Sequence, residues 1–235
     1  MFDRTRSDRN AALLATVTID EGQPVSWQLL GGPEVLVGEE PLNIQADRVR
    51  AVTFFLVLHA GQRIPTDRLI DALWPDHPPK TARNSVQRFV ADLRRRLGPS
   101  ADRITTTADG YQLLLKPGDT VDADQADHGL RQGRLCFEND EPGQTLSALE
   151  GLVEGPIEPL QGLYDLQTLA VDRVRLNDLA NEVLQLRVSS HLALRDYPAS
   201  IITARRLTDR DPHREQAWAD IMVSLYRQGR VGEAL

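Results

Sequence analysis

The chain has 235 residues, of which 41% are hydrophobic and 26% charged, and its formal net charge is −7. These values are typical of a globular protein, and the length suits two modest domains. No apolar run approaches about twenty residues, which excludes a membrane-spanning helix. Cys136 is the single cysteine, which excludes an internal disulfide. No signal peptide is recognisable, which predicts a cytoplasmic protein.

The first 44 residues divide into a featureless segment and a small sheet. Residues 1–24 carry no clear pattern and are expected to form a flexible arm or an added strand. Short apolar runs follow at residues 25–31, 34–37 and 41–44, separated by Gly-Gly-Pro and Gly-Glu-Glu turns. Apolar runs between turn residues predict strands, and we expect a small antiparallel sheet.

Two helices are predicted next. Residues 48–61 form an apolar segment that ends in a glycine, which favours a buried helix. Residues 66–74 predict a short second helix, capped by Thr66 or Asp67 and stopped by Pro75.

The third predicted helix, over residues 78–98, carries a strong local charge. Thr81 is its expected cap and Gly98 its expected end. Six Lys/Arg against one acid give this segment a net charge of 6 − 1 = +5 on an acidic protein. Its apolar residues follow helical spacing and fill one stripe: Val86, Phe89, Val90, Leu93 and Leu97. A localised positive charge attracts the phosphate backbone of a duplex.

The opposite side of this helix carries side chains that suit base edges. They are Asn84, Gln87, Arg88, Ala91 and Arg95. Asn and Gln can bond bidentately to adenine and Arg to guanine, while Ala can meet a thymine methyl group. We expect these five residues to read bases in the major groove, although a solvated charged face would explain the helix taken alone.

Residues 103–115 predict a β-hairpin around Asp109-Gly110, so the order is sheet, three helices, hairpin. Motifs spaced along these elements are Leu30-Gly31-Gly32-Pro33-Glu34-Val35, Arg50-Ala51, Asp67-Arg68-Leu69-Ile70-Asp71-Ala72-Leu73-Trp74, Pro78-Pro79, Ala82-Arg83-Asn84, Leu93-Arg94-Arg95, Leu97-Gly98 and Gly110-Tyr111. With them the chain resembles the DNA-binding half of the Streptomyces antibiotic regulatory protein (SARP, AfsR-like) family, which has an OmpR-type winged helix.

The resemblance implies roles for residues around the third helix. The helix would enter the major groove and the hairpin would be the wing. Phosphate contacts are then expected from Arg50, Lys80, Thr81, Arg83, Arg94, Arg96, Thr105, Thr106, Thr107 and Tyr111. The loop Trp74, Pro75, Asp76 and His77 would face RNA polymerase. Two positions depart from the family pattern: Arg88 replaces an apolar residue and Asp92 a basic one, and Asp92 is expected to repel phosphate.

The second half differs in charge and pattern. Residues 1–118 hold 15 basic and 14 acidic residues (+1), whereas residues 119–235 hold 12 and 20 (−8), so this half should bind nucleic acid poorly. The join over residues 116–127 contains four aspartates, which we interpret as a solvated linker that caps the next helix. The glycine and closing Glu of an EF-hand loop are missing, so no metal site is expected.

A helical repeat follows the join. Ala217-Trp218, Tyr226, Gln228-Gly229-Arg230 and Glu233-Ala234-Leu235 fit a tetratricopeptide repeat (TPR), and residues 133–149 suit a further helix pair. Gly155-Pro156-Ile157 and Leu160 resemble the bacterial transcriptional activation domain of SARP proteins. Stacked repeats favour a concave surface for a protein partner, and simple packing on the first half is the alternative.

The sequence therefore predicts an α+β winged helix-turn-helix followed by an all-α TPR-like domain, with boundaries at 1–24, 25–118 and 119–235. The expected function is that of a cytoplasmic, nucleoid-associated activator that binds direct repeats in double-stranded DNA, with a possible homodimer there. It would recruit RNA polymerase holoenzyme through its sigma and alpha subunits.

Alternatives are a TPR-like interaction or sensory module, and the regulatory front end of a longer signalling ATPase. The repeat is expected to be cut at residue 235. No catalytic motif or phosphate loop is present, so neither an enzyme nor a cofactor is expected. The abundance of Arg over Lys (Lys80 and Lys116 only) indicates a GC-rich, actinobacterial genome.

Overall fold

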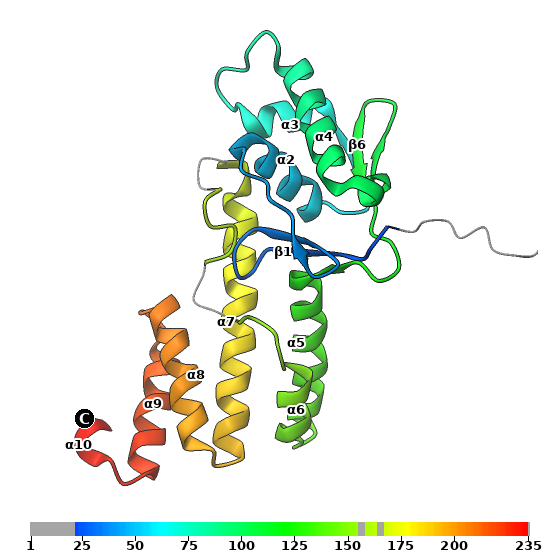
Figure 1. Ribbon diagram of the computed structural model, residues 1–235. Coiled ribbons are helices and arrows are strands. Elements are labelled where there is room, and N and C mark those ends of the chain that lie inside the picture. The colour runs from blue at the N-terminus through cyan, green and yellow to red at the C-terminus, as the bar shows by residue number, and fades with distance from the viewer. Residues whose placement is uncertain (1–21, 155–157, 164–166, 235) are drawn as a thin grey trace, which may run out of the picture.

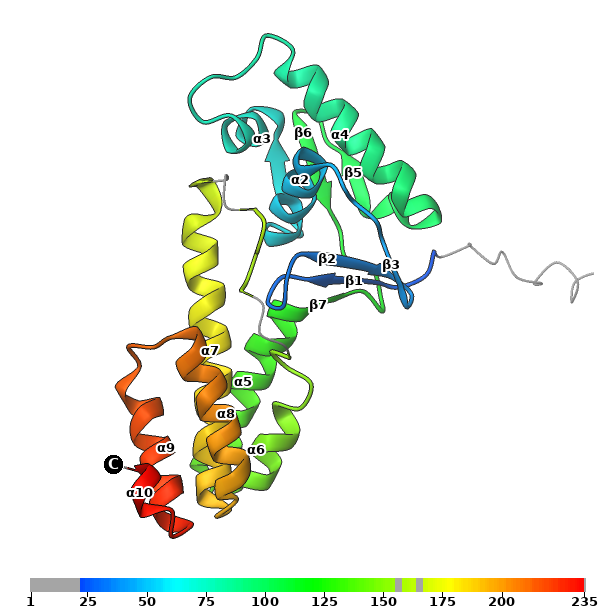
Figure 2. The same ribbon diagram turned by 60° about the vertical axis from the view of Figure 1, so that its left-hand side comes forward.

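The structure is a computed structural model that describes residues 22–154, 158–163 and 167–234. Most of the arm expected over residues 1–24 lies outside these ranges, as do Gly155-Pro156-Ile157 and Leu235. Figures 1 and 2 show a mixed α/β part from which long helices extend downward. The predicted fold class, a winged helix followed by a helical domain, is confirmed.

The N-terminal sheet forms as an antiparallel unit with one addition. Strand β1 (Val25–Gln28) pairs antiparallel with β2 (Glu34–Val37), which pairs with the short β3 (Glu40–Pro41). The fourth strand, β7 (Thr120–Val121), lies parallel to β1 on the other side and was not predicted. The sheet order is therefore β3-β2-β1-β7.

The three predicted helices are confirmed as α2 (Asp47–Leu58), α3 (Thr66–Leu73) and α4 (Ala82–Leu97). The predicted caps are wrong. Thr66 is already inside α3, and its hydroxyl donates instead to the Asp109 carbonyl oxygen at 3.0 Å. Thr81 holds the cap position of α4, but its hydroxyl accepts no hydrogen bond from the described residues that follow it.

The predicted hairpin is confirmed as β5 (Ile104–Thr106) and β6 (Gly110–Leu113), after a 3₁₀ turn η1 (Gly98–Arg103). A third strand, β4 (Arg63–Pro65), pairs with β6. A Cβ on Gly110 would lie only 2.0 Å from the Ile64 carbonyl oxygen. Glycine is therefore needed here for close approach of β4, rather than for a left-handed turn.

The join over residues 116–127 is not a solvated linker, so that interpretation is wrong. The carboxylate of Asp119 is fully buried and forms an ion pair with Arg103, whose side chain is 2% exposed, at 2.9 Å. Asp122 accepts hydrogen bonds from the backbone N–H groups of Leu29 and Leu30 at 2.8 and 2.9 Å. Buried carboxylates need such partners, and these bonds fix the join to the end of β1.

The helical half (residues 122–234) consists of helix pairs. They are α5 (Asp122–Glu138) with α6 (Pro142–Ala148), α7 (Ala170–Ala193) with α8 (Tyr197–Arg210), and α9 (Glu215–Arg227) with α10 (Val231–Ala234). The short turn η2 (Gln167–Leu169) precedes α7. The predicted helix pair over 133–149 is confirmed, although its first helix begins earlier, at Asp122.

The two halves share a hydrophobic core. One cluster of buried side chains runs from Val25 in β1 to Ala217 in α9. The backbone N–H of Leu160 donates to the Leu29 carbonyl oxygen at 3.1 Å. In both views the N-terminal end of α7 reaches the winged helix beside α3 (Figures 1 and 2). The helical half thus packs on the first half, as the alternative interpretation expected.

Candidate nucleic-acid interface

The proposed base-reading stripe of α4 faces solvent. Its apolar stripe is buried against α2 and α3, with Val86, Val90 and Leu93 almost fully covered. Because the two stripes oppose each other on one helix, burial of the first turns the second outward. All five residues are exposed: Asn84, Gln87, Arg88, Ala91 and Arg95. Figure 2 shows α4 at the end of the molecule away from α9 and α10.

Asp92 binds two arginines of its own helix. It forms ion pairs with Arg95 and, at 2.8 Å, with Arg96. The hydrogen bond from Arg96 lowers the pKa of the Asp92 carboxyl below its ordinary value, against the opposing effect of burial. Asp92 therefore stands within a local charge cluster, and its single negative charge is offset by these neighbours.

The N-terminal end of α4 presents further cations. Lys80 is exposed and makes no hydrogen bond or ion pair with the described part of the chain. Arg83 forms an ion pair with Asp67 of α3 at 2.6 Å, and both side chains are more than half exposed. Such exposed pairs contribute little to stability, so Arg83 can exchange Asp67 for a phosphate at small cost.

Arg94 and Arg96 join α4 to its neighbours. Arg94 donates to the Ile104 carbonyl oxygen at 2.8 Å and to the Thr106 hydroxyl at 2.9 Å, and its guanidinium lies 5.9 Å from the Tyr111 ring centre. Arg96 donates to the carbonyl oxygen of Asn43. These two side chains bind α4 to the wing and to the segment between β3 and α2. Phosphate contact by either stays a prediction.

The hydroxyl groups of the wing bond within the hairpin. Thr105 donates to the Gln112 carbonyl oxygen at 3.3 Å. Thr107 donates to Asp109 at 3.2 Å and accepts from the Gly110 N–H at 3.1 Å. The Tyr111 ring is buried. The wing is thus internally braced, and Thr106 is its most accessible candidate for phosphate.

Arg50 points toward the helical half. A Cβ built on Gly162 would lie 3.9 Å from both terminal nitrogens of Arg50. The side chain also lines a cavity of about 420 Å³ with Asn43 and Phe54. Phosphate contact by Arg50 stays a prediction.

The first residue of the candidate polymerase-facing loop is Trp74, whose ring is stacked on another aromatic ring. The ring of Trp74 stacks on that of Phe89, 6.3 Å away between ring centres, and the guanidinium of Arg48 lies over the Trp74 ring, 5.4 Å from its centre. Pro75, Asp76 and His77 are exposed. Sequence reasoning missed Arg48, because nothing in its local pattern indicates a partner 26 residues away along the chain.

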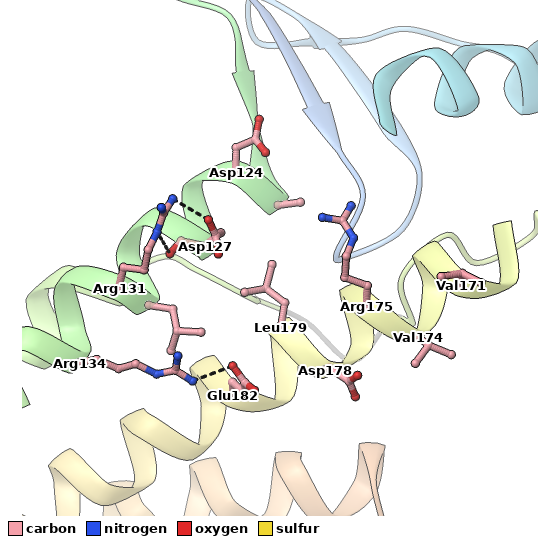
Figure 3. Close-up of a pocket in the computed structure, with 12 residues that line it drawn as sticks. Asp124, Asp127, Arg131, Arg134, Val171, Val174, Arg175, Asp178, Leu179 and Glu182 are labelled. Carbon is pink, nitrogen blue, oxygen red and sulfur yellow. Dashed lines mark hydrogen bonds and ion pairs between the residues drawn. The ribbon is translucent and has the colours of Figure 1, made fainter. Parts of the chain in front are cut away.

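A second hollow lies between α5 and α7 (Figure 3), with a volume of about 600 Å³. Its walls carry both positive and negative side chains. Arg134 pairs across it with Glu182 at 2.8 Å, and Arg131 pairs with Asp127 at 2.6 Å.

Within the described residues, no group of three or more His, Cys, Asp and Glu side chains could hold a metal ion. Among the same residues, every helix is too short or too polar to span a bilayer.

Each half of the chain matches the model of a known domain family. The model of the C-terminal domain of transcriptional regulatory proteins matches residues 45–113, and that of the bacterial transcriptional activator domain matches residues 121–235. Two similar regulators are DnrI of Streptomyces peucetius (27% identical over 205 residues) and AfsR of Streptomyces coelicolor (27% over 223 residues). The chain belongs to the SARP family of transcriptional regulators.

The matches cover different fractions of these SARP relatives. The match to DnrI covers 81% of this chain and 73% of DnrI, whereas the match to AfsR covers 92% of this chain and 22% of AfsR. A solved structure of Mycobacterium tuberculosis EmbR, in complex with a low-affinity phosphopeptide, is 24% identical with a TM-score of 0.78. It covers 90% of this chain and 57% of the EmbR chain, and it supports the fold.

Proposed function

We propose that this SARP regulator is a sequence-specific activator whose helix α4 reads a half-site in the major groove. The single observation that carries the proposal is the exposed stripe of amide, guanidinium and methyl groups from Asn84 to Arg95. Asn, Gln and Arg are the side chains that make bidentate bonds to base edges. The wing, held to α4 by Arg94, would then lie on the adjacent backbone.

The two halves of the chain have different roles in this proposed function. A winged helix over residues 25–118 binds DNA, and an activation domain over residues 119–235 supports assembly. Two copies bind direct repeats near a promoter, as a homodimer on DNA, and the exposed loop from Trp74 to His77 contacts RNA polymerase holoenzyme. The protein acts in the cytoplasm at the nucleoid.

Selection of bound sequences from a random duplex pool tests this proposal. The purified chain should enrich one motif that recurs with a fixed centre-to-centre spacing of about one or two helical turns. Binding to the enriched duplex should weaken steeply with salt, as expected where cations replace condensed counterions. A pool that stays random after repeated rounds would contradict sequence-specific binding.

Lys80→Ala should weaken binding to all duplexes to a similar extent. A lysine with no partner in the described part of the chain is free to neutralise one phosphate, so its loss should flatten the plot of log affinity against log salt by about one unit. Fluorescence anisotropy at several salt concentrations measures the slope. Lys116→Ala is the matched control, because Lys116 pairs with Asp102. Loss confined to the selected duplex would contradict a phosphate role for Lys80.

Asp76→Ala combined with His77→Ala should separate activation from DNA binding. Both side chains are exposed in the loop before α4, so their removal should leave duplex affinity unchanged and lower transcript yield several-fold. In vitro transcription with RNA polymerase holoenzyme at saturating activator measures the yield. Glu39→Ala, in the exposed turn between β2 and β3, is the control. Full transcript yield from the double variant would remove the loop from the proposal.

A further inference from the structure

The C-terminal end of α3 is held by side chains from both halves of the protein. The last carbonyl groups of a helix lack partners within the helix. Here Arg48 of α2 donates to the Leu73 carbonyl oxygen at 2.5 Å. Thr168 of η2 donates its hydroxyl hydrogen to the Ala72 carbonyl oxygen at 3.1 Å. Neighbouring carbonyls of one helix end are thus bound from opposite domains.

The Thr168 contact lies where the helical half meets the winged helix. Leu169, the next residue, is fully buried in the same core cluster as Ala72 and Leu73. The end of α7 that follows lies beside α3 in both views (Figures 1 and 2). Packing and a hydrogen bond therefore both connect the start of α7 to the end of α3.

The bound carbonyls come directly before the exposed loop. Trp74 follows Leu73, and its ring contacts both Arg48 and Phe89. Arg48 therefore binds the helix end through one nitrogen and faces the first loop residue through its planar group, where a cation–π contact stabilises the ring. The position of Trp74 thus depends on the same contacts that hold α3.

Helix α4 packs on α3 but also has anchors that do not involve the end of α3. Its residues Val86, Val90 and Leu93 are buried in the core, and Arg94 and Arg96 bind the wing and the segment between β3 and α2. Loss of the contacts at the end of α3 should leave these anchors intact. The segment from Trp74 to His77 can then shift while Lys80 and the reading stripe keep their places.

We propose that Thr168 and Arg48 are positioning residues that let the helical half set the place of the Trp74–His77 loop. The inference rests on the proposed function, in which this loop contacts RNA polymerase. The helical half then acts on transcription through the winged helix, in addition to any surface of its own. DNA binding by α4 is independent of this coupling.

The test compares Thr168→Val, Thr168→Ser and Arg48→Met in the full chain. Hydrogen exchange of the backbone amides of Trp74, Asp76 and His77 should be faster in Thr168→Val and Arg48→Met. Transcript yield at saturating activator should fall several-fold, with unchanged duplex affinity. Thr168→Ser keeps the hydroxyl donor and should behave as wild type.

Thr208→Val is the matched control, because the Thr208 hydroxyl donates to the carbonyl oxygen of Arg205 within its own helix α8 at 2.9 Å. It should change neither loop exchange nor transcript yield. Unchanged loop exchange in both Thr168→Val and Arg48→Met would overturn the coupling. Exchange that rises equally in α8 would show general destabilisation and would also overturn it.

The failure of the two proposals can be told apart. If Asp76→Ala with His77→Ala leaves the transcript yield intact, the polymerase contact fails, but the exchange experiment still measures the coupling. In another outcome the double variant loses activation, whereas Thr168→Val shows faster loop exchange and keeps its full transcript yield. The contact between the loop and RNA polymerase is then supported. The positioning role of Thr168 in activation is then refuted.

Discussion

Asp119→Asn should lower the free energy of unfolding by about 3–5 kcal/mol, the usual cost of removing one partner from a buried ion pair. Its carboxylate is fully buried and receives hydrogen bonds from Arg103 at 2.9 Å, from the Val25 N–H at 2.8 Å and from the Lys116 N–H at 2.8 Å. The amide substitution removes the buried counter-charge of the Arg103 guanidinium and leaves only the longer contact with the exposed Asp102. Urea unfolding followed by circular dichroism measures the loss.

Asp102→Asn is the matched control for this pair. Asp102 also contacts Arg103, at 3.5 Å, but its side chain is 53% exposed. An exposed ion pair contributes at most about 1 kcal/mol, so this variant should stay close to wild type. Equal destabilisation by the two substitutions would show that burial of Asp119 does not govern the energy.

The effect of Asp119→Asn should depend on pH. Burial alone would raise the pKa of the Asp119 carboxyl, but hydrogen bonds from Arg103, Lys116 and Val25 outweigh it and hold the pKa below its ordinary value of 3.8. A carboxyl whose pKa is lowered by folding stabilises the fold above its unfolded pKa, and this stabilisation is lost as pH falls through the folded pKa. The stability difference between wild type and variant should therefore shrink below about pH 3.8.

Helical spacing was enough to predict the elements that form the candidate interface. The apolar residues of α4 repeat with the helical period, so the polar stripe had to face the other way. The hairpin and the helix order were predictable for the same local reason, because glycine and proline mark where each element ends. Exposure of the stripe follows from these local rules.

The join between the halves depends on partners far apart in the sequence. Asp119 bonds the backbone of Val25, 94 residues away, and Asp122 bonds that of Leu29, 93 residues away. Strands of two or three residues, such as β7 and β4, are too short to show a period. A run of aspartates therefore looked like a solvated linker, and only tertiary packing reveals its buried pair.

Contacts at the candidate interface also differ in whether sequence spacing can predict them. Asp92 and Arg96 stand four residues apart, so their pairing could have been predicted from spacing alone. The bond between Thr168 and Ala72 crosses 96 residues and both halves. No local pattern indicates it, because a threonine hydroxyl can donate to any nearby carbonyl oxygen.

Arg88→Ala should remove discrimination at one base position, at a cost of about 1–3 kcal/mol on the selected duplex. Its side chain is exposed, and its terminal nitrogen lies 3.2 Å from the hydroxyl of Ser85. This long hydrogen bond to a neutral hydroxyl within one helix can be exchanged for bidentate bonds to the N7 and O6 acceptors of guanine. The fold should keep its stability, because an exposed side chain leaves no cavity when it is shortened.

Competition between the selected duplex and its single-base variants measures this discrimination. Wild type should prefer one base pair at the Arg88 position, and the alanine variant should bind all four alike, with only a small loss on random duplexes. Arg131→Ala is the matched control, since Arg131 is an exposed arginine on α5 with a partner in its own helix. An equal loss of affinity on selected and random duplexes would instead assign Arg88 to phosphate, because a backbone contact carries no sequence information.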